Sequence, residues 1–435
     1  MVVYGGLEWF VALLVNAALV AYLALFPAFF AVVLRRITMR FGPMALMTAP
    51  LVWIATELGR TYLLTGFPWV LLGYSQASVL PIAQLASVFG VYGVSALVVL
   101  VNAGFASLGA SPPEGGHYGR IIPLATSLAT VALVALWGAS RLSSSTLTRE
   151  GDPIRVGLIQ GNVAQTEKWD PARGPSIFAD YLRLTEQAIA DGAQIVIWPE
   201  ASTPFFFELE TAKADQIRAI ARGARVPILV GSDQVERGAM DRYFNSAFLL
   251  GPDGTTAAIY RKMHLVPFGE YVPLQKLLFF AERLVVAAGD FSAGDEETLF
   301  PVAGHHMSTA ICYEIIYPDL VRRFASAGSE LLSTITNDAW FGQTSAPYQH
   351  FAQASMRAIE NGRYLVRSAN TGISGVVDPY GRPLAQSRIF EQAVIVREVR
   401  FLRTSTLYTR IGDVLAYASA IVSLAMLVLA RRRVQ

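Results

Sequence analysis

The chain has 435 residues, of which 53% are hydrophobic and 16% are charged, and its formal net charge is +2. The first 150 residues hold only eleven charged side chains, whereas the following 285 hold fifty-seven. This distribution excludes a wholly soluble protein and a pure channel or carrier, and the near-neutral charge gives no support for nucleic-acid binding.

Charge-free apolar stretches in the first third predict helices that cross a bilayer, whose core needs about 20 apolar residues per helix. We expect a transmembrane helical domain over 1–142 and a C-terminal segment over 401–435 that ends in a basic tail. The predicted spans are 9–34, 43–64, 84–109, 121–140 and 412–430.

Arginine placement predicts how these spans are oriented. Basic residues follow the first span at 35–40 and the last span at 431–433, which assigns both positions to the cytoplasmic side. Five alternating spans then place the large segment 141–411 outside. Between the second and third spans, residues 65–83 are apolar but broken by Gly and Pro, which fits an irregular connector or one wall of a lipid-facing entrance.

The water-facing segment begins with a Ser/Thr-rich linker over 143–153 and continues as alternating strand and helix patterns over 154–400. This order predicts an α/β layered domain. The expected strands are 155–160, 195–198, 228–231, 245–250, 307–312, 331–336, 365–368, 375–378 and 392–398. The expected helices are 174–190, 209–223, 315–327 and 347–361.

Three features of this domain could carry chemistry. Cys312, the one cysteine of the chain, ends a short apolar strand, where the start of a helix can stabilise a thiolate. Glu200 follows a buried strand, at the strand end where α/β sheets place their sites. The segment 260–273 concentrates Lys262, His264 and Glu270. Taken singly, these features are more often a buried structural cysteine, a helix-capping or turn carboxylate and a solvated basic loop.

The sequence gives no pattern for a metal or a cofactor. The five histidines show no ligand spacing with Cys312, and the chain has no glycine-rich nucleotide-binding motif. We therefore expect no metal and no cofactor.

In combination, the ordered series Glu200, Lys262 and Cys312 resembles the Glu-Lys-Cys triad of the carbon–nitrogen hydrolase (nitrilase) superfamily over about 154–400. With the flanking spans, the chain resembles the apolipoprotein N-acyltransferase family. The phrases that carry this resemblance are TGFPW from Thr65, GYSQ from Gly73, QGN from Gln160, KWD from Lys168, WPE from Trp198, HLVPFGEYVP from His264, ICYE from Ile311 and NDAWFG from Asn337. The family usually has eight spans, so we expect that about three N-terminal spans are missing from the sequence.

The resemblance implies an αββα sandwich and an acyl transfer that proceeds through a Cys312 thioester. Glu200 would be the base and Lys262 would stabilise the oxyanion. Glu270 and Glu314 would support the site, and Tyr313 and Trp169 also match family positions. For Trp169, a lid aromatic that only packs on the sheet is an equal alternative. We assign His264 a structural role.

The resemblance also implies the partners and the location. The acyl donor would be a membrane phospholipid, phosphatidylethanolamine in our expectation, and the acceptor the α-amine of a diacylglyceryl-cysteine at an apolipoprotein N-terminus. We expect a monomer in the bacterial inner membrane, with the catalytic domain on the periplasmic side. A membrane-tethered amidase or nitrilase that uses water, and a transport or scaffold protein that only binds ligands, are the alternatives.

Two further apolar stretches, 205–207 and 277–284, lie close to the expected site residues along the chain. They fit either buried core or segments that dip into the outer leaflet and admit acyl chains.

Overall fold

The computed structural model describes residues 8–109, 118–271 and 291–431. The chain forms two compact units. One unit is built on Thr146–Ser405, and the other combines Phe10–Ser145 with Thr406–Gln435. The apolar stretch predicted over 277–284 lies outside the described residues.

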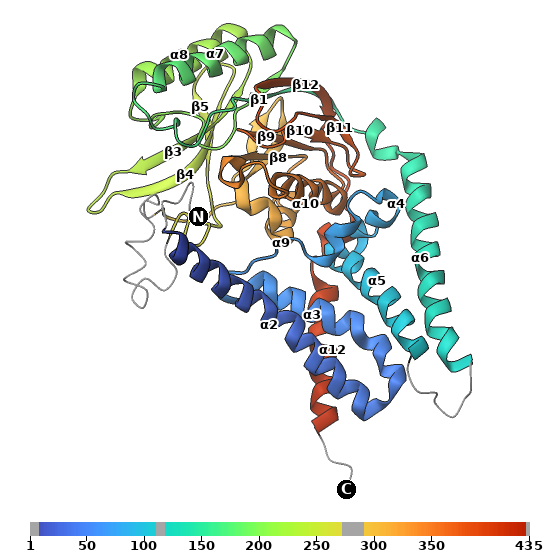
Figure 1. Ribbon diagram of the computed structural model, residues 1–435. Helices are drawn as coiled ribbons and strands as arrows, with labels where there is room; N and C mark the ends of the chain where they lie inside the picture. Colours follow the sequence, from blue (N-terminus) through green and yellow to red (C-terminus); the bar gives the residue numbers. More distant parts are fainter. Residues whose placement is uncertain (1–7, 110–117, 272–290, 432–435) are drawn as a thin grey trace. The chain divides into compact units, whose positions relative to one another are not determined.

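The second unit is helical (Figure 1). Its α-helices are α2 (Trp9–Phe41), α3 (Ala49–Tyr62), α4 (Leu80–Ala83), α5 (Ala86–Gly109), α6 (Tyr118–Ser144), α11 (Leu407–Ile411) and α12 (Val414–Arg431). Short 3₁₀ helices η1 (Pro43–Thr48), η2 (Leu63–Thr65) and η3 (Leu72–Gln76) connect them.

Within the described residues, four helical stretches are long and apolar enough to cross a membrane. They are Trp9–Phe41, Ala86–Gly109, Ile121–Arg149 and Val414–Arg431. The span predicted over 43–64 is divided between η1 and the 14-residue helix α3, which packs against α5 and α12. The five-span topology and the domain limits remain predictions.

Two charged side chains of α3 hold the irregular segment that follows it. Glu57 is 3% exposed, and its Oε1 accepts hydrogen bonds from the Leu72 amide (2.7 Å) and from Trp53 Nε1 (3.0 Å). Arg60 Nη2 donates to the Trp69 carbonyl oxygen at 3.0 Å. Because an unpaired polar group is costly in an apolar environment, these bonds fix the backbone between Trp69 and Leu72.

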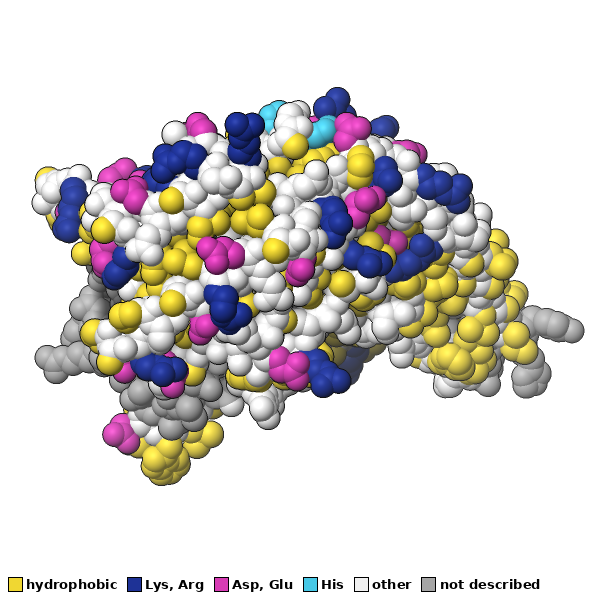
Figure 2. Space-filling view, turned by 90° about the horizontal axis from the view of Figure 1, so that it is seen from above, with side chains coloured by type: hydrophobic (Ala, Val, Ile, Leu, Met, Phe, Trp, Pro, Cys, Tyr) yellow, Lys and Arg dark blue, Asp and Glu magenta, His cyan; other side chains and the backbone are white. Residues whose placement is uncertain are grey.

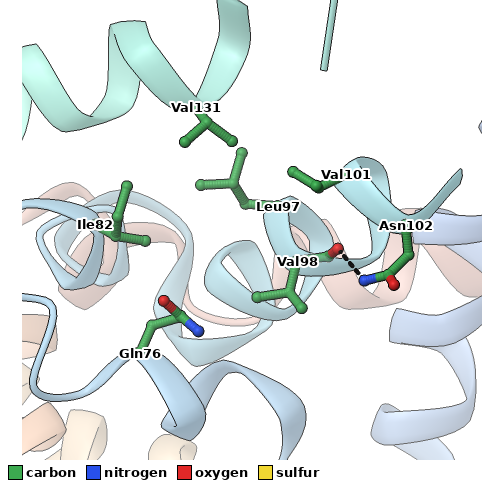
Figure 3. A pocket seen from close by; sticks show the side chains of 7 residues that line it. All are labelled: Gln76, Ile82, Leu97, Val98, Val101, Asn102 and Val131. Atoms are coloured by element: carbon green, nitrogen blue, oxygen red, sulfur yellow. Dashed lines mark hydrogen bonds between the residues drawn. The ribbon is translucent and has the colours of Figure 1, made fainter. Parts of the chain in front are cut away.

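A pocket of about 230 Å³ lies among α5, α6, α4 and η3 (Figure 3). Its lining is mostly aliphatic, and the Nδ2 of Asn102 donates to the Val98 carbonyl oxygen at 2.8 Å. The lining residues are Gln76, Ile82, Leu97, Val98, Val101, Asn102 and Val131. None of the predicted site residues contributes to this pocket.

The first unit contains two six-stranded sheets. The first sheet has the order β12-β1-β2-β3-β4-β5 and the second has the order β11-β10-β9-β8-β7-β6. The strands of the first sheet are β1 (Pro153–Gln160), β2 (Ile195–Ile197), β3 (Ile228–Glu236), β4 (Arg242–Leu250), β5 (Thr256–Arg261) and β12 (Ala393–Arg400). Those of the second are β6 (Phe300–Val302), β7 (His305–Ile311), β8 (Leu331–Thr336), β9 (Leu365–Ala369), β10 (Gly375–Val377) and β11 (Pro383–Gln386).

The two sheets face each other, with β1 against β9 and β4 against β7. The helices α7 (Gly174–Ala190) and α8 (Thr211–Ala224) cover the first sheet, and α9 (Pro318–Ser326) and α10 (Ala346–Asn361) lie on the second (Figure 1). The unit is therefore the expected αββα sandwich. On the face seen in Figure 2, basic and acidic side chains are interspersed, in keeping with the higher charge density of this part of the chain.

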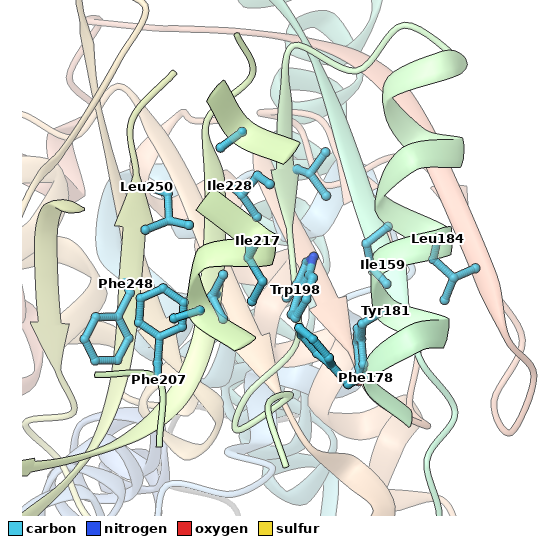
Figure 4. Close-up of a cluster of buried hydrophobic side chains, with 14 of the residues drawn as sticks. Ile159, Phe178, Tyr181, Leu184, Trp198, Phe207, Ile217, Ile228, Phe248 and Leu250 are labelled. Atoms are coloured by element: carbon cyan, nitrogen blue, oxygen red, sulfur yellow. The ribbon is translucent and has the colours of Figure 1, made fainter. Parts of the chain in front are cut away.

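The apolar core between the first sheet and its helices explains why these segments fold as they do (Figure 4). In α7, Ile177, Tyr181, Leu184 and Ala188 are buried at the helical spacing that the sequence predicted. Tyr181 stacks on Trp198 with ring centroids 4.9 Å apart. This packing locks the chain immediately before Glu200.

Most predicted elements of this unit are confirmed. All nine expected strands are present, and the four expected helices are found with small shifts at their ends, the third being divided into η6 (Cys312–Ile316) and α9. The sequence analysis missed β5, β6 and β11, which are short or partly exposed. Phe205 and Phe207 are core residues, 3% and 0% exposed, so the expectation that they reach the lipid is wrong.

Candidate active site

The predicted site residues follow strands that run in the same direction within each sheet. Glu200 comes shortly after β2, and Lys262 directly follows β5, which the antiparallel pairs β3–β4 and β4–β5 align with β2. Cys312 directly follows β7, and Asn337 directly follows the parallel strand β8. Hydrogen bonds between the two sheets then bring these strand ends together.

Glu200 is buried, with 8% of its surface exposed, and each of its carboxylate oxygens accepts a hydrogen bond. Its Oε1 accepts from Asn245 Nδ2 at 2.7 Å, and its Oε2 accepts from the backbone amide of Asn337 at 2.7 Å. Asn245 lies on β4 of the first sheet, whereas Asn337 belongs to the second. The carboxylate is therefore fixed from both sheets.

Lys262 lies between two carboxylates and is only 1% exposed. Its Nζ is 2.8 Å from Glu270 Oε1 and 3.6 Å from Glu200 Oε1. Burial by itself lowers the pKa of Lys262, but Glu270 and Glu200 raise it more, so the pKa lies above its ordinary value. Asn245 Nδ2 also donates to Glu270 Oε1 at 2.9 Å, so one amide orients both carboxylates around a permanent cation.

Cys312 is partly exposed and occupies the left-handed region with φ +53°, at the turn from β7 into η6. A residue with a side chain adopts this conformation only where its surroundings enforce it. Burial and the Glu200 carboxylate raise the pKa of the Cys312 thiol, and the Lys262 charge offsets this only in part. The Cys312 side chain is therefore a thiol at neutral pH, and it would need a base in order to act as a nucleophile.

Glu314 links the cysteine turn to the lysine segment. It is fully buried, and its Oε2 accepts from the Ile311 amide at 2.7 Å. Its Oε1 accepts from the amides of Met263 and His264 at 2.7 and 3.0 Å and from the Tyr260 hydroxyl at 2.8 Å. One carboxylate thus holds the residues before Cys312 and after Lys262 in register.

The two predicted aromatic residues lie in different surroundings. Trp169 is 50% exposed, and Lys168 Nζ lies 5.7 Å from the centre of its ring. Tyr313 is 7% exposed and packs against Tyr317 and His264. The His264 ring centre is 3.9 Å from that of Tyr317.

Sequence reasoning missed three polar residues at this site. Asn245 pairs with Asp233 in the β3–β4 register, which puts both near the end of the sheet that carries Glu200. Burial raises the pKa of Asp233 to about 6 and lowers that of Lys168, and each charge favours the charged form of the other. Lys168 belongs to the phrase KWD, which is among those that carry the family resemblance, so the sequence did contain a signal for it. Asp233 and Asn245 gave none, because only the sheet brings them to the site.

The described residues contain no cluster of three or more His, Cys, Asp or Glu side chains that could hold a metal ion. The groups described at this site are four carboxylates (Glu200, Glu270, Asp233 and Glu314), the two lysines Lys168 and Lys262, and the amide of Asn245. This set can take up a thiol proton and stabilise a negative oxygen.

Two family models and curated relatives match this chain. Residues 155–407 match the family model described as Carbon-nitrogen hydrolase, and residues 1–104 match that of the Apolipoprotein N-acyltransferase N-terminal domain. A relative from Geobacter metallireducens named apolipoprotein N-acyltransferase is 42% identical, over 99% of this chain and 82% of the relative. One of the same name from Methylococcus capsulatus is 35% identical, over 94% of this chain and 79% of the relative.

Among solved structures, the chain is similar to a cysteine-to-serine mutant of a nitrilase-superfamily amidase from Nesterenkonia AN1. The identity is 22%, the TM-score is 0.44, and the match covers 59% of this chain and 93% of the amidase.

The facing sheets and the match over residues 155–407 define the class of the first unit, a carbon–nitrogen hydrolase domain. The near full-length relatives and the match of the N-terminal region go further: the chain belongs to the apolipoprotein N-acyltransferase family. It is an acyltransferase of the carbon–nitrogen hydrolase superfamily with membrane-spanning helices.

Proposed function

We propose that the protein transfers an acyl chain from a membrane phospholipid to the α-amine of an N-terminal diacylglyceryl-cysteine, with Glu200, Lys262 and Cys312 as the catalytic residues. The observation that carries the proposal is the buried Lys262 ammonium, 2.8 Å from Glu270 and 3.6 Å from Glu200, beside a single cysteine. Its lipid substrates would reach it from the bilayer.

In the first half-reaction, Glu200 takes the proton of the Cys312 thiol as the sulfur attacks the ester carbonyl of the phospholipid. Lys262 stabilises the negative oxygen of the tetrahedral intermediate, a contribution of about 3–4 kcal/mol for one preorganised donor. When the intermediate collapses, the lysophospholipid oxygen leaves and takes the proton from Glu200. The acyl chain remains on Cys312 as a thioester.

In the second half-reaction, the acceptor amine attacks the thioester carbonyl and Glu200 takes one proton from its nitrogen. Lys262 again stabilises the oxyanion. Collapse breaks the carbon–sulfur bond, the sulfur recovers its proton from Glu200, and the N-acylated lipoprotein leaves. Because the lysophospholipid leaves before the acceptor amine attacks, the kinetics should be ping-pong.

The supporting residues have separate roles in this scheme. Glu270 orients Lys262 and keeps it charged, because its Oε1 is the closest carboxylate oxygen to Nζ. Glu314 keeps the cysteine and lysine segments together. Trp169, exposed beside the site, and Tyr313 are proposed to contact the substrates. The reaction needs neither a metal nor a cofactor.

We further propose that the protein acts as a monomer in the bacterial inner membrane, with the site on the periplasmic side and phosphatidylethanolamine as donor. The arginine clusters at 35–40 and 431–433 support this orientation. A chain that combines membrane-spanning helices with the catalytic domain also suits two lipid substrates better than the soluble substrates of an amidase.

A product assay tests the proposed function against hydrolysis by water. The purified protein is incubated with phosphatidylethanolamine that carries an isotope-labelled acyl chain, with and without a diacylglyceryl-cysteine peptide. We expect labelled N-acyl peptide in the first reaction and little free fatty acid in the second. Release of free fatty acid at the same rate in both reactions, without acylated peptide, would instead establish a hydrolase.

A further inference from the structure

The left-handed conformation of Cys312 raises the question of what enforces it. Its preceding amide, that of Ile311, is bound by Glu314 at 2.7 Å. On the other side, the carbonyl oxygen of Cys312 lies 3.2 Å from His350 Nε2. His350 comes from α10 and is completely buried. The nucleophile turn is therefore held by one side chain from within and by one from another helix.

His350 is in turn held by a buried charged network. Its Nδ1 lies 3.0 Å from Asp338 Oδ1 and 3.0 Å from Arg367 Nη2. Arg367 donates to Asp338 Oδ2 at 2.8 Å, and the Thr336 hydroxyl donates to Asp338 Oδ1 at 2.9 Å. A Cβ on Gly372 would lie 2.2 Å from Asp338 Oδ2, so only glycine at this position leaves space for the carboxylate.

The hydrogen-bond roles follow from the partners. A carbonyl oxygen only accepts, so His350 must donate to Cys312 through Nε2–H. Arg367 only donates, so Nδ1 accepts from it. An unprotonated Nδ1 donates nothing to the Asp338 carboxylate, which instead holds the ring through its ion pair with Arg367. Burial and the Arg367 charge lower the pKa of His350, although Asp338 opposes them, which agrees with a neutral ring protonated on Nε2. The ring therefore acts here as a fixed donor.

The same turn that orients His350 also holds the proposed base. The amide of Asn337 donates to Glu200 Oε2 at 2.7 Å, and the next residue, Asp338, binds Arg367, which donates to His350 Nδ1. Two adjacent residues after β8 thus contact Glu200 directly and Cys312 through one imidazole.

We propose that His350, anchored by Asp338 and Arg367, is a positioning residue that holds the Cys312 turn so that the sulfur faces Glu200. The inference rests on the proposed function only in taking Cys312 as the nucleophile. Because His350 contacts backbone and not substrate, its loss should lower kcat and leave KM for both lipids unchanged.

The test compares His350→Gln with His350→Asn in the full-length protein. Glutamine places its amide nitrogen near the position of Nε2 and can still reach the Cys312 carbonyl, whereas asparagine places it near Nδ1 and cannot. His306→Gln, on the exposed side of β7, is the matched control. Since the chain has one cysteine, iodoacetamide modification followed by mass spectrometry reports on Cys312 alone.

We expect His350→Asn to slow both the modification of Cys312 and kcat by about tenfold or more, since small displacements of reacting groups have such effects. His350→Gln should recover most of both rates. Equal rates in the two variants and the wild type would overturn the proposal. If His350→Asn does not fold, Asp338→Asn replaces it, with unchanged modification again the contrary result. Normal modification in a wild type that acylates no peptide would refute the proposed function and leave this inference standing.

Discussion

The charge of Lys262 decides what the neighbouring carboxylates can do. Glu270 lies closer to its Nζ than Glu200 does, 2.8 Å against 3.6 Å. Glu270 can therefore neutralise the lysine while Glu200 remains available for a proton. Asn245 donates hydrogen bonds to both carboxylates and so fixes the position of each. Without Glu270, Lys262 would pair with Glu200 alone, and Glu200 would be less able to accept a proton.

Glu200→Gln should separate thiol reactivity from catalysis. Burial and the Glu200 charge raise the pKa of the Cys312 thiol, so removing the charge lowers that pKa and increases the thiolate fraction at pH 8. We expect faster iodoacetamide modification of Cys312, measured by mass spectrometry. Acyl transfer should fall by about 10²–10⁴-fold because the general base is lost.

The control for this experiment is Glu186→Gln, an exposed carboxylate on α7. It should change neither rate. If Glu200→Gln left acyl transfer at the wild-type rate, Glu200 would not be the base.

At the scale of elements, Glu200 depends on the close approach of its turn to β3. A Cβ on Gly231 would lie 2.2 Å from the Pro199 carbonyl oxygen and 2.9 Å from Glu200 Cα. Gly231→Ala must therefore displace the turn. We expect kcat to fall by about tenfold or more, with a lower melting temperature. Gly223→Ala in α8, where a Cβ meets no atom within 4 Å, is the control for both measurements. Full activity in Gly231→Ala would show that catalysis tolerates movement of Glu200.

In the membrane unit, α3 and the segment after it should depend on Glu57. Glu57→Ala removes the acceptor for the Leu72 amide and leaves it unpaired, at a cost of about 1–3 kcal/mol. Hydrogen–deuterium exchange in detergent should show faster exchange of peptides that cover 63–79. Thr130→Ala, at a partly exposed position of α6, should leave that exchange unchanged. Unchanged exchange in Glu57→Ala would mean that other contacts hold the segment.

The sequence anticipated those elements whose signal is local. The buried strand before Glu200 is a continuous apolar run, the strand before Cys312 is mostly buried, and α7 has a clear helical spacing of apolar residues. The short strands β6 and β11 have no such run. Asn245, Asp338 and His350 escaped notice because their partners lie far away in the sequence, in other strands and helices. Likewise, the sequence does not show that Phe205 and Phe207 belong to the buried core, because the residues that enclose them come from other strands and helices.

On the scale of the whole molecule, the uneven charge of the sequence corresponds to two units with different surroundings. The helical unit holds apolar stretches of membrane length, and the sandwich holds the candidate site. In our proposal, the first holds lipid substrates at the membrane and the second performs the transfer. The proposed transfer in two half-reactions requires a covalent acyl-enzyme, which should accumulate when the acceptor is absent.

Intact-protein mass spectrometry with phosphatidylethanolamine and no acceptor tests this central claim most directly. The account predicts a mass increase of one acyl chain at Cys312, absent in Cys312→Ala and discharged when a diacylglyceryl-cysteine peptide is added. No adduct on the wild type, or the same adduct on Cys312→Ala, would contradict it.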